Sequence, residues 1–99
     1  MEINEKPIEE FVEKHKMDER DYYMQARVME EEAREVKVAL LQYDGRAVRE
    51  EAADVIIATM VLAEIGGWLD ELPELVAEKM RENLEKPVGR NPGEKVRKA

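Results

Sequence analysis

The spacing of its apolar residues constrains the fold of this chain most strongly. Between residues 18 and 43 they recur at alternating steps of four and three. This stripe consists of Tyr22, Ala26, Met29, Ala33, Val36, Leu40 and Tyr43. Such spacing places the stripe on one face of a helix, as in helical bundles and coiled coils. Asp18 suits the N-cap of this helix. No segment alternates with the period of two that is typical of strands, so we predict an all-α protein.

The same criteria predict three further helices. They cover residues 7–16, 46–65 and 73 to 84 or 85. Pro7 and Pro73 suit first helical turns, and Pro87 stops the last helix. Asp44-Gly45 and Gly66-Gly67 interrupt the pattern as turns or helix ends. The third helix is apolar nearly all round after Glu51, which predicts a central position in a four-helix bundle.

Length, charge and cysteine content narrow the class of protein. The 99 residues fit one small domain, which we expect to cover residues 1–90, followed by a flexible basic tail at 91–99. No cysteine is present, which excludes disulfides and thiolate–zinc sites. The net charge of −8 disfavours nucleic acid as a partner. Neither a membrane-spanning run nor a signal peptide is recognisable, so we expect a cytoplasmic protein with no membrane partner.

Asp54 is the only charge in the run AADVIIATMVLA at residues 52–63. Removing an unpaired carboxylate from water is costly, so this position predicts a partner for Asp54. Two acidic motifs are present, Glu31-Glu32-x-x-Glu35 and Glu50-Glu51-x-x-Asp54, with no cationic cluster between them. A metal ion is therefore one candidate partner. The alternative is that Asp54 pairs with Arg34 or Arg49 while the glutamates form a solvated face.

Helix geometry brings the two motifs together if Asp44-Gly45 closes an antiparallel hairpin. The carboxylates concerned, Glu32, Glu35, Glu51 and Asp54, then occupy a band about one to two turns tall. Mutual repulsion would raise their pKa values, and a hard divalent cation would relieve it. Mg²⁺ prefers oxygen ligands and often shares its shell with substrate phosphates. The pattern thus predicts metal-dependent chemistry on a phosphorylated compound. A di-iron carboxylate site fits less well, because it needs Glu-x-x-His on two helices and His15 is the only histidine.

With the element Glu78-Lys79-Met80-x-x-Asn83-x-x-Lys86-Pro87, these motifs resemble the MazG-like superfamily of all-α nucleoside triphosphate pyrophosphohydrolases. The resemblance covers about residues 18–90. It implies hydrolysis of the bond between the α- and β-phosphates of (deoxy)nucleoside triphosphates. The products are a monophosphate and pyrophosphate, and the cofactor is Mg²⁺, with Mn²⁺ as a possible substitute.

The resemblance also implies roles for individual residues. The metal ligands would be Glu32, Glu35, Glu51 and Asp54. Glu31 would lie near the attacking water, and Lys79 and Asn83 would contact the triphosphate. Lys86 or Arg90 would be the trailing basic residue. The general base stays open among Glu31, Glu32 and Glu35. The run Glu50-Glu51-Ala52-Ala53-Asp54 also resembles phosphoribosyl-ATP pyrophosphohydrolase, which is the alternative within this class.

Other partners follow from the apolar and aromatic residues. The stripe and the third helix offer more apolar surface than four short helices can bury, which predicts a homodimer or homotetramer. The aromatic candidates for stacking on a nucleobase are Tyr22, Tyr23, Tyr43 and Trp68, with core packing as the alternative, especially for Tyr22 and Tyr43. A function of another class is an acidic helical interaction module that binds a basic protein. The charge of Asp54 amid apolar residues favours the enzyme.

Overall fold

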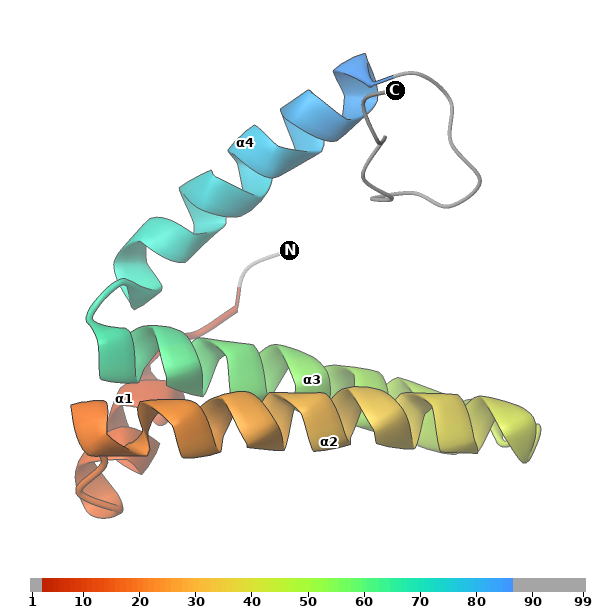
Figure 1. Ribbon diagram of the computed structural model, residues 1–99, viewed down its shortest axis with the longest axis horizontal. Coiled ribbons are helices and arrows are strands. Elements are labelled where there is room, and N and C mark those ends of the chain that lie inside the picture. The colour runs from red at the N-terminus through yellow and green to blue at the C-terminus, as the bar shows by residue number, and fades with distance from the viewer. Residues whose placement is uncertain (1–2, 87–99) are drawn as a thin grey trace. The chain divides into compact units, whose positions relative to one another are not determined.

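The computed structural model describes residues 3–86, and within them the regular secondary structure is all helical, without strands (Figure 1). The helices are α1 (Lys6–Lys14), α2 (Tyr22–Leu41), α3 (Gly45–Gly66) and α4 (Leu72–Glu85), with short 3₁₀ turns η1 (Glu19–Asp21) and η2 (Leu69–Glu71). The predicted all-α class and four helices are confirmed, with ends that differ by a few residues. The predicted tail at 91–99 and Arg90 lie outside the described residues. The chain divides into two compact units, Met1–Leu69 and Asp70–Ala99.

Helices α2 and α3 form an antiparallel hairpin and lie side by side along their length (Figure 1). Tyr43 adopts a left-handed conformation with φ of 53°. The Asp44 N–H donates to the Ala39 carbonyl at 3.2 Å and the Tyr43 N–H to the Leu40 carbonyl at 3.1 Å, the pattern of a Schellman motif. The Asp44 carboxylate then accepts from the Ala47 N–H at 3.1 Å and caps α3. These bonds hold the turn that sets the register of the two helices.

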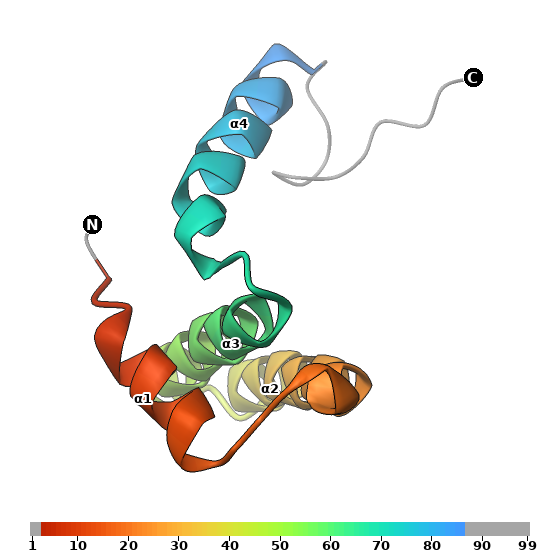
Figure 2. The same cartoon turned by 90° about the vertical axis from the view of Figure 1, so that its left-hand side faces the viewer.

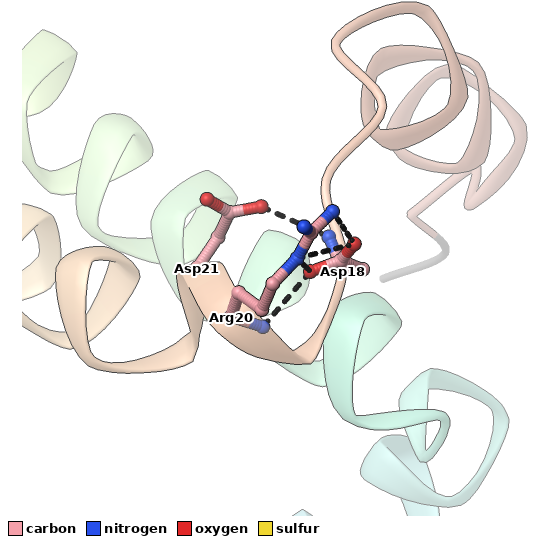
Figure 3. A network of polar contacts seen from close by, with 3 residues as sticks. All are labelled: Asp18, Arg20 and Asp21. Carbon is pink, nitrogen blue, oxygen red and sulfur yellow. Dashed lines mark hydrogen bonds and ion pairs between the residues drawn. The ribbon is translucent and has the colours of Figure 1, made fainter.

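A reciprocal capping arrangement leads into α2 (Figure 3). The Asp18 carboxylate accepts from the Arg20 N–H at 2.9 Å, and the Asp18 N–H donates to Asp21 Oδ2 at 2.9 Å. The Arg20 guanidinium also contacts the Asp18 carboxylate, at 2.6 Å. This hydrogen bonding lowers the pKa of Asp18 from 3.8 to about 2. The predicted N-cap at Asp18 is confirmed, although one 3₁₀ turn precedes the α-helix.

The apolar core of the first unit lies at the end of the hairpin where α1 packs against α3 (Figures 1 and 2). Its buried members are Ile8, Ala58, Met60, Val61, Ala63, Ile65 and Leu69. Gln25 is the buried polar residue among those described, and its Nε2 donates to the Ala58 carbonyl at 2.9 Å. This bond ties α2 to α3 at the edge of the core.

The face of α2 that packs on α3 differs from the predicted stripe. The buried or half-buried residues of α2 are Tyr22, Gln25, Val28, Met29, Glu32, Val36 and Ala39. The predicted stripe is wrong at Ala26, Ala33, Leu40 and Tyr43, which are exposed. The two stripes share three positions, and the helix is rotated so that Gln25 and Glu32 face inward in place of Ala26 and Ala33. The seam of the hairpin therefore carries polar groups.

Within the first unit α3 contacts both α1 and α2, and its buried residues all lie in its C-terminal half. Within the same unit the N-terminal half of α3 buries no side chain, and farther along the helix Ile56 and Ile57 are 44% and 48% exposed. The acidic motifs belong to this thinner stretch of the hairpin. They are therefore not enclosed by the core that surrounds the other end of α3.

The two glycines that end α3 have different roles. Gly67 has φ of 80°, the left-handed conformation common after a helix end, as predicted for Gly66-Gly67. A side chain at Gly66 would clash with the indole of Trp68.

The second unit contains α4, which buries no side chain of its own, and Pro73 lies in its first turn as predicted. Among residues 3–86, no helix combines the length and the apolar content needed to cross a membrane.

Candidate metal centre

Glu32 and Glu35 of α2 and Glu51 of α3 form a compact acidic cluster across the hairpin. Each contributes a carboxylate oxygen, and these three oxygens lie within 4.8 Å of one another. Glu32 and Glu35 are three residues apart and share a side of α2. The turn at residues 42–44 places Glu51 opposite them. The structure thus brings together three of the four predicted metal ligands, and we refer to Glu32, Glu35 and Glu51 as the carboxylate cluster.

Two oxygens of the carboxylate cluster are buried without a hydrogen-bond donor. They are Oε2 of Glu32 and Oε2 of Glu51, while both side chains as a whole are half-buried and Glu35 is exposed. None of the ion pairs between the described residues includes a member of the cluster. Buried polar oxygens without a donor are destabilising, and in native proteins they commonly mark a functional site or a bound ion. When its carboxylates are ionised, the cluster therefore offers oxygen ligands for which the described residues provide no donor.

The electrostatics of the cluster follow from its crowding. A hydrogen bond with Glu35, then burial and the charges of Glu35, Asp54 and Glu32, raise the pKa of Glu51 from 4.5 to about 7. Burial, followed by the charges of Glu35 and Asp54, also raises the pKa of Glu32. Without a cation, the cluster thus holds a proton near neutral pH. A divalent cation would displace this proton and neutralise the repulsion.

Asp54 differs from its prediction in two respects. Its side chain is exposed, so the expected cost of burying it in apolar sequence does not arise. It also lies outside the group of oxygens within 4.8 Å, although its charge acts on the pKa values of Glu32 and Glu51. The alternative partners Arg34 and Arg49 form no ion pair with it in the described part of the chain. The case for a metal thus depends on Glu32 and Glu51 instead.

The remaining predicted site residues lie apart from the cluster or in the second unit. Glu31 is exposed and lines a separate cavity on α2. On α4, Lys79 pairs with Glu82 at 3.1 Å, and the ammonium of Lys86, the residue after this helix, donates to Asn83 Oδ1 at 3.0 Å. These contacts are local to α4, and the spacing of Lys79 and Asn83 places both on one side of that helix.

The aromatic candidates divide into two groups. Trp68 Nε1 donates to the Tyr22 hydroxyl at 3.1 Å, and both residues are half-buried. This bond links the start of α2 to the end of α3. Tyr22 thus has a packing role within the fold, which is the alternative to stacking on a nucleobase. Tyr23 and Tyr43 are 87% and 96% exposed and have no such contact. His15 is exposed and lies against Phe11, with ring centroids 4.4 Å apart.

Two features of this region were missed from the sequence. One is Gln25, which lies at helical spacing from Met29, Glu32 and Val36. This spacing indicates the inward face of α2 only if polar residues are counted along with apolar ones. The other is the cavity beside Glu31, lined by Arg27, Glu30, Glu31 and Arg34. Its sequence signal is a pair of arginines seven residues apart on one helix.

No protein-family model, curated protein or solved structure matches this chain.

Proposed function

We propose that this protein is a divalent-metal-dependent nucleotide pyrophosphohydrolase of the MazG-like all-α type. It would hydrolyse (deoxy)nucleoside triphosphates between the α- and β-phosphates, consuming one water and releasing a monophosphate and pyrophosphate. The observation that carries the proposal is the carboxylate cluster. Two of its oxygens are buried without a donor, as expected of ligands awaiting a cation.

The donor set of the cluster fits Mg²⁺, with Mn²⁺ as a substitute. All its ligand atoms are carboxylate oxygens, which hard divalent cations prefer, and no histidine or cysteine is present among them. Glu32, Glu35 and Glu51 would hold the ion, with Asp54 as the fourth ligand, since its charge already acts on the cluster. The bound ion would polarise a phosphoryl oxygen and lower the pKa of a bound water.

The residues around the cluster would complete the site. Glu31, Glu32 and Glu35 remain the candidates for the base that accepts the proton of the attacking water. Lys79 and Asn83 of α4, and Lys86 directly after it, are proposed to bind phosphate oxygens. This requires the contact of Lys79 with Glu82 and that of Lys86 with Asn83 to break. Phosphoribosyl-ATP stays an alternative substrate, because the cluster alone does not select the rest of the nucleotide.

Assembly into a homodimer or homotetramer is part of the proposal. Its support is the uncovered side of α3 within the first unit, where Ile56 and Ile57 are both exposed. The same surface, with the exposed Asp54 beside it, also favours the alternative of an interaction module for another protein. Sedimentation of the purified protein distinguishes self-association from a monomer, and the enzyme assay below separates the two functions.

A pyrophosphate-release screen tests the proposed activity. The substrates are the eight common ribo- and deoxyribonucleoside triphosphates and phosphoribosyl-ATP, each with Mg²⁺, with Mn²⁺ and with a chelator. We expect metal-dependent release of pyrophosphate from at least one of them. Mutation of a residue that only supports a metal ligand commonly lowers metal affinity or activity by about 10- to 100-fold. Glu35→Gln alters a proposed ligand itself, so it should reduce the rate by about 100-fold or more.

Glu50→Gln is the matched control for this screen. Glu50 precedes Glu51 in the chain, but its carboxylate points to Arg46, at 3.1 Å. Exposed ion pairs contribute little to stability, so loss of this pair should leave the fold and the carboxylate cluster intact. The variant should therefore keep the wild-type rate. Release of orthophosphate in place of pyrophosphate, or equal rates for Glu35→Gln and Glu50→Gln, would contradict the proposal.

A further inference from the structure

Part of the apolar stripe predicted for α2 lies uncovered on the surface of that helix. Ala26, Ala33 and Leu40 follow one another at steps of seven residues, or two helical turns, so they share one side of α2. All three are exposed, and Leu40 is 57% exposed. Met29 and Val36 lie between them and are half-buried. We refer to these five residues as the uncovered stripe, and continuous apolar surface of this kind commonly marks a contact with a protein.

The uncovered stripe faces away from the acidic side of the hairpin. Ala33 lies two residues before Glu35, which is about 200° around the helix axis. On α3, Ala52 and Ile56 each lie two residues from Asp54, so the same angle separates them from it, and both are exposed. Both helices thus present carboxylates on one side and apolar side chains on another. A protein that packs on the apolar side leaves the carboxylate cluster accessible.

The uncovered stripe reads nearly the same in both directions from Ala33. Ala26 and Leu40 each lie seven residues from Ala33. Met29 precedes it by four residues, and Val36 follows it by three. In a symmetric dimer residue i contacts residue j and j contacts i, so a surface that matches its own reverse fits a second copy of the chain. The small side chain at the centre allows the two helices to approach closely.

Two charged residues at the edge of the uncovered stripe follow the same symmetry. Glu30 and Lys37 lie four residues after Ala26 and Ala33, so they are neighbours of these alanines on the helix surface. Both are exposed, and neither forms an ion pair within residues 3–86. An antiparallel pair of helices centred near Ala33 places Glu30 of each copy at the level of Lys37 of the other. A parallel pair would bring like charges to the same level, and charges beside an apolar seam set the orientation of paired helices.

We infer that two copies of this chain associate through the uncovered stripe, with their α2 helices antiparallel and Glu30 of each copy paired with Lys37 of the other. This dimer gives the assembly named in the proposed function a surface and an orientation, and it rests on that part of the proposed function alone. The residues that fail to face α3 are then buried between two molecules. Each copy keeps its own carboxylate cluster outside the interface.

Cysteine cross-linking of the full-length protein tests the orientation, because the chain has no cysteine of its own. Ala33→Cys should form a disulfide-linked dimer under mild oxidation, since its two copies meet near the symmetry axis. Ala26→Cys alone should not, because its copies lie about 21 Å apart along the axis, beyond the reach of a disulfide. A mixture of Ala26→Cys and Leu40→Cys should link one copy of each. The control is Glu31→Cys, on the side of α2 opposite Ala33, which should stay unlinked.

Sedimentation equilibrium measures the strength of the dimer. Leu40→Lys and Ala33→Glu each occur twice in a symmetric dimer and bring charge into its interface, so each should weaken dimerisation by about tenfold or more. Glu30→Lys should also weaken it, and adding Lys37→Glu should restore it, because the exchanged charges attract again. Met24→Lys is the matched control, since Met24 is 66% exposed on the opposite side of α2 and should leave the dimer unchanged. Circular dichroism checks that every variant stays helical.

The results that overturn this dimer differ from those that overturn the metal centre, whose Mn²⁺ affinity is measured from the free-ion signal in electron paramagnetic resonance. A monomeric wild type would leave the uncovered stripe to another protein, and a dimer unchanged by Leu40→Lys would use another surface. Either result refutes the inference, and the metal centre stands if Mn²⁺ binds. Linking of Ala26→Cys to itself but not to Leu40→Cys would show a parallel pair and refute the orientation. If the predicted links form but the wild type binds no Mn²⁺, the proposed enzyme falls and the dimer stands.

Discussion

Replacing Glu51 with glutamine should stabilise the metal-free protein at pH 8 and abolish its response to Mg²⁺. The pKa of Glu51 is about 7 in the folded protein, against 4.5 ordinarily. The folded state thus keeps a proton that the unfolded chain releases, so stability falls as pH rises from about 4.5 to about 7 and stays low above that. Glutamine carries no charge and keeps a donor for Glu35. It should therefore raise the melting temperature at pH 8 and have little effect at pH 4.

The same pKa fixes the pH dependence of metal binding. Because protons and metal compete for the carboxylate, the ionised fraction of Glu51 sets the apparent affinity. This fraction is about one tenth at pH 6, about one half at pH 7 and about nine tenths at pH 8 for a pKa of about 7. The apparent Mn²⁺ affinity should thus fall about fivefold from pH 7 to pH 6 and rise less than twofold from pH 7 to pH 8.

Two measurements decide the matter. Thermal unfolding with and without Mg²⁺ at pH 4, 6 and 8 gives the stability, and the resonance of free Mn²⁺ gives the affinity. Metal that binds the folded state alone raises the melting temperature of the wild type and of Glu50→Gln, and leaves that of Glu51→Gln unchanged. Equal Mn²⁺ affinity at pH 6 and pH 8, or a lower melting temperature of metal-free Glu51→Gln at pH 8, would refute the reasoning.

Three further predictions concern the scaffold. Gln25→Ala leaves the buried Ala58 carbonyl without its donor and should cost about 2 kcal/mol in urea unfolding, whereas the exposed Gln42→Ala should stay within about 0.5 kcal/mol of the wild type. Gly67→Ala places a side chain at φ of 80° and should cost about 1 kcal/mol in the same assay; no change would argue against the left-handed helix end. The Asp18 carboxyl should titrate by NMR with a pKa of about 2, so that its stabilising contribution is lost as pH falls from about 3.8 through 2. Arg20→Ala should return this pKa toward 3.8, and a wild-type value already near 3.8 would contradict the capping contacts.

The carboxylate cluster shows how far sequence reasoning reached for the site. Glu32, Glu35 and Glu51 were predicted to meet because two motifs lie at mirror positions about one turn, and their oxygens do lie within 4.8 Å. Asp54 was predicted from the same mirror positions and also from burial in an apolar run. Its carboxylate lies outside the group within 4.8 Å, and the burial argument was wrong because its side chain is exposed. The arginine-lined cavity was not predicted, since two arginines among glutamates look like an ordinary solvated face.

Local signals were sufficient for the helices and their ends. Asp18, Asp44 and Gly67 act through hydrogen bonds and backbone angles within one or two turns, so their effects can be inferred from neighbouring residues. The side of α2 that is buried is a different kind of property. Two stripes share Tyr22, Met29 and Val36, and hydropathy favours the one that contains Ala26 and Ala33. Packing against α3 selects the other, in which Gln25 bonds to Ala58 and Glu32 meets Glu51, because burial depends on which groups the partner helix presents.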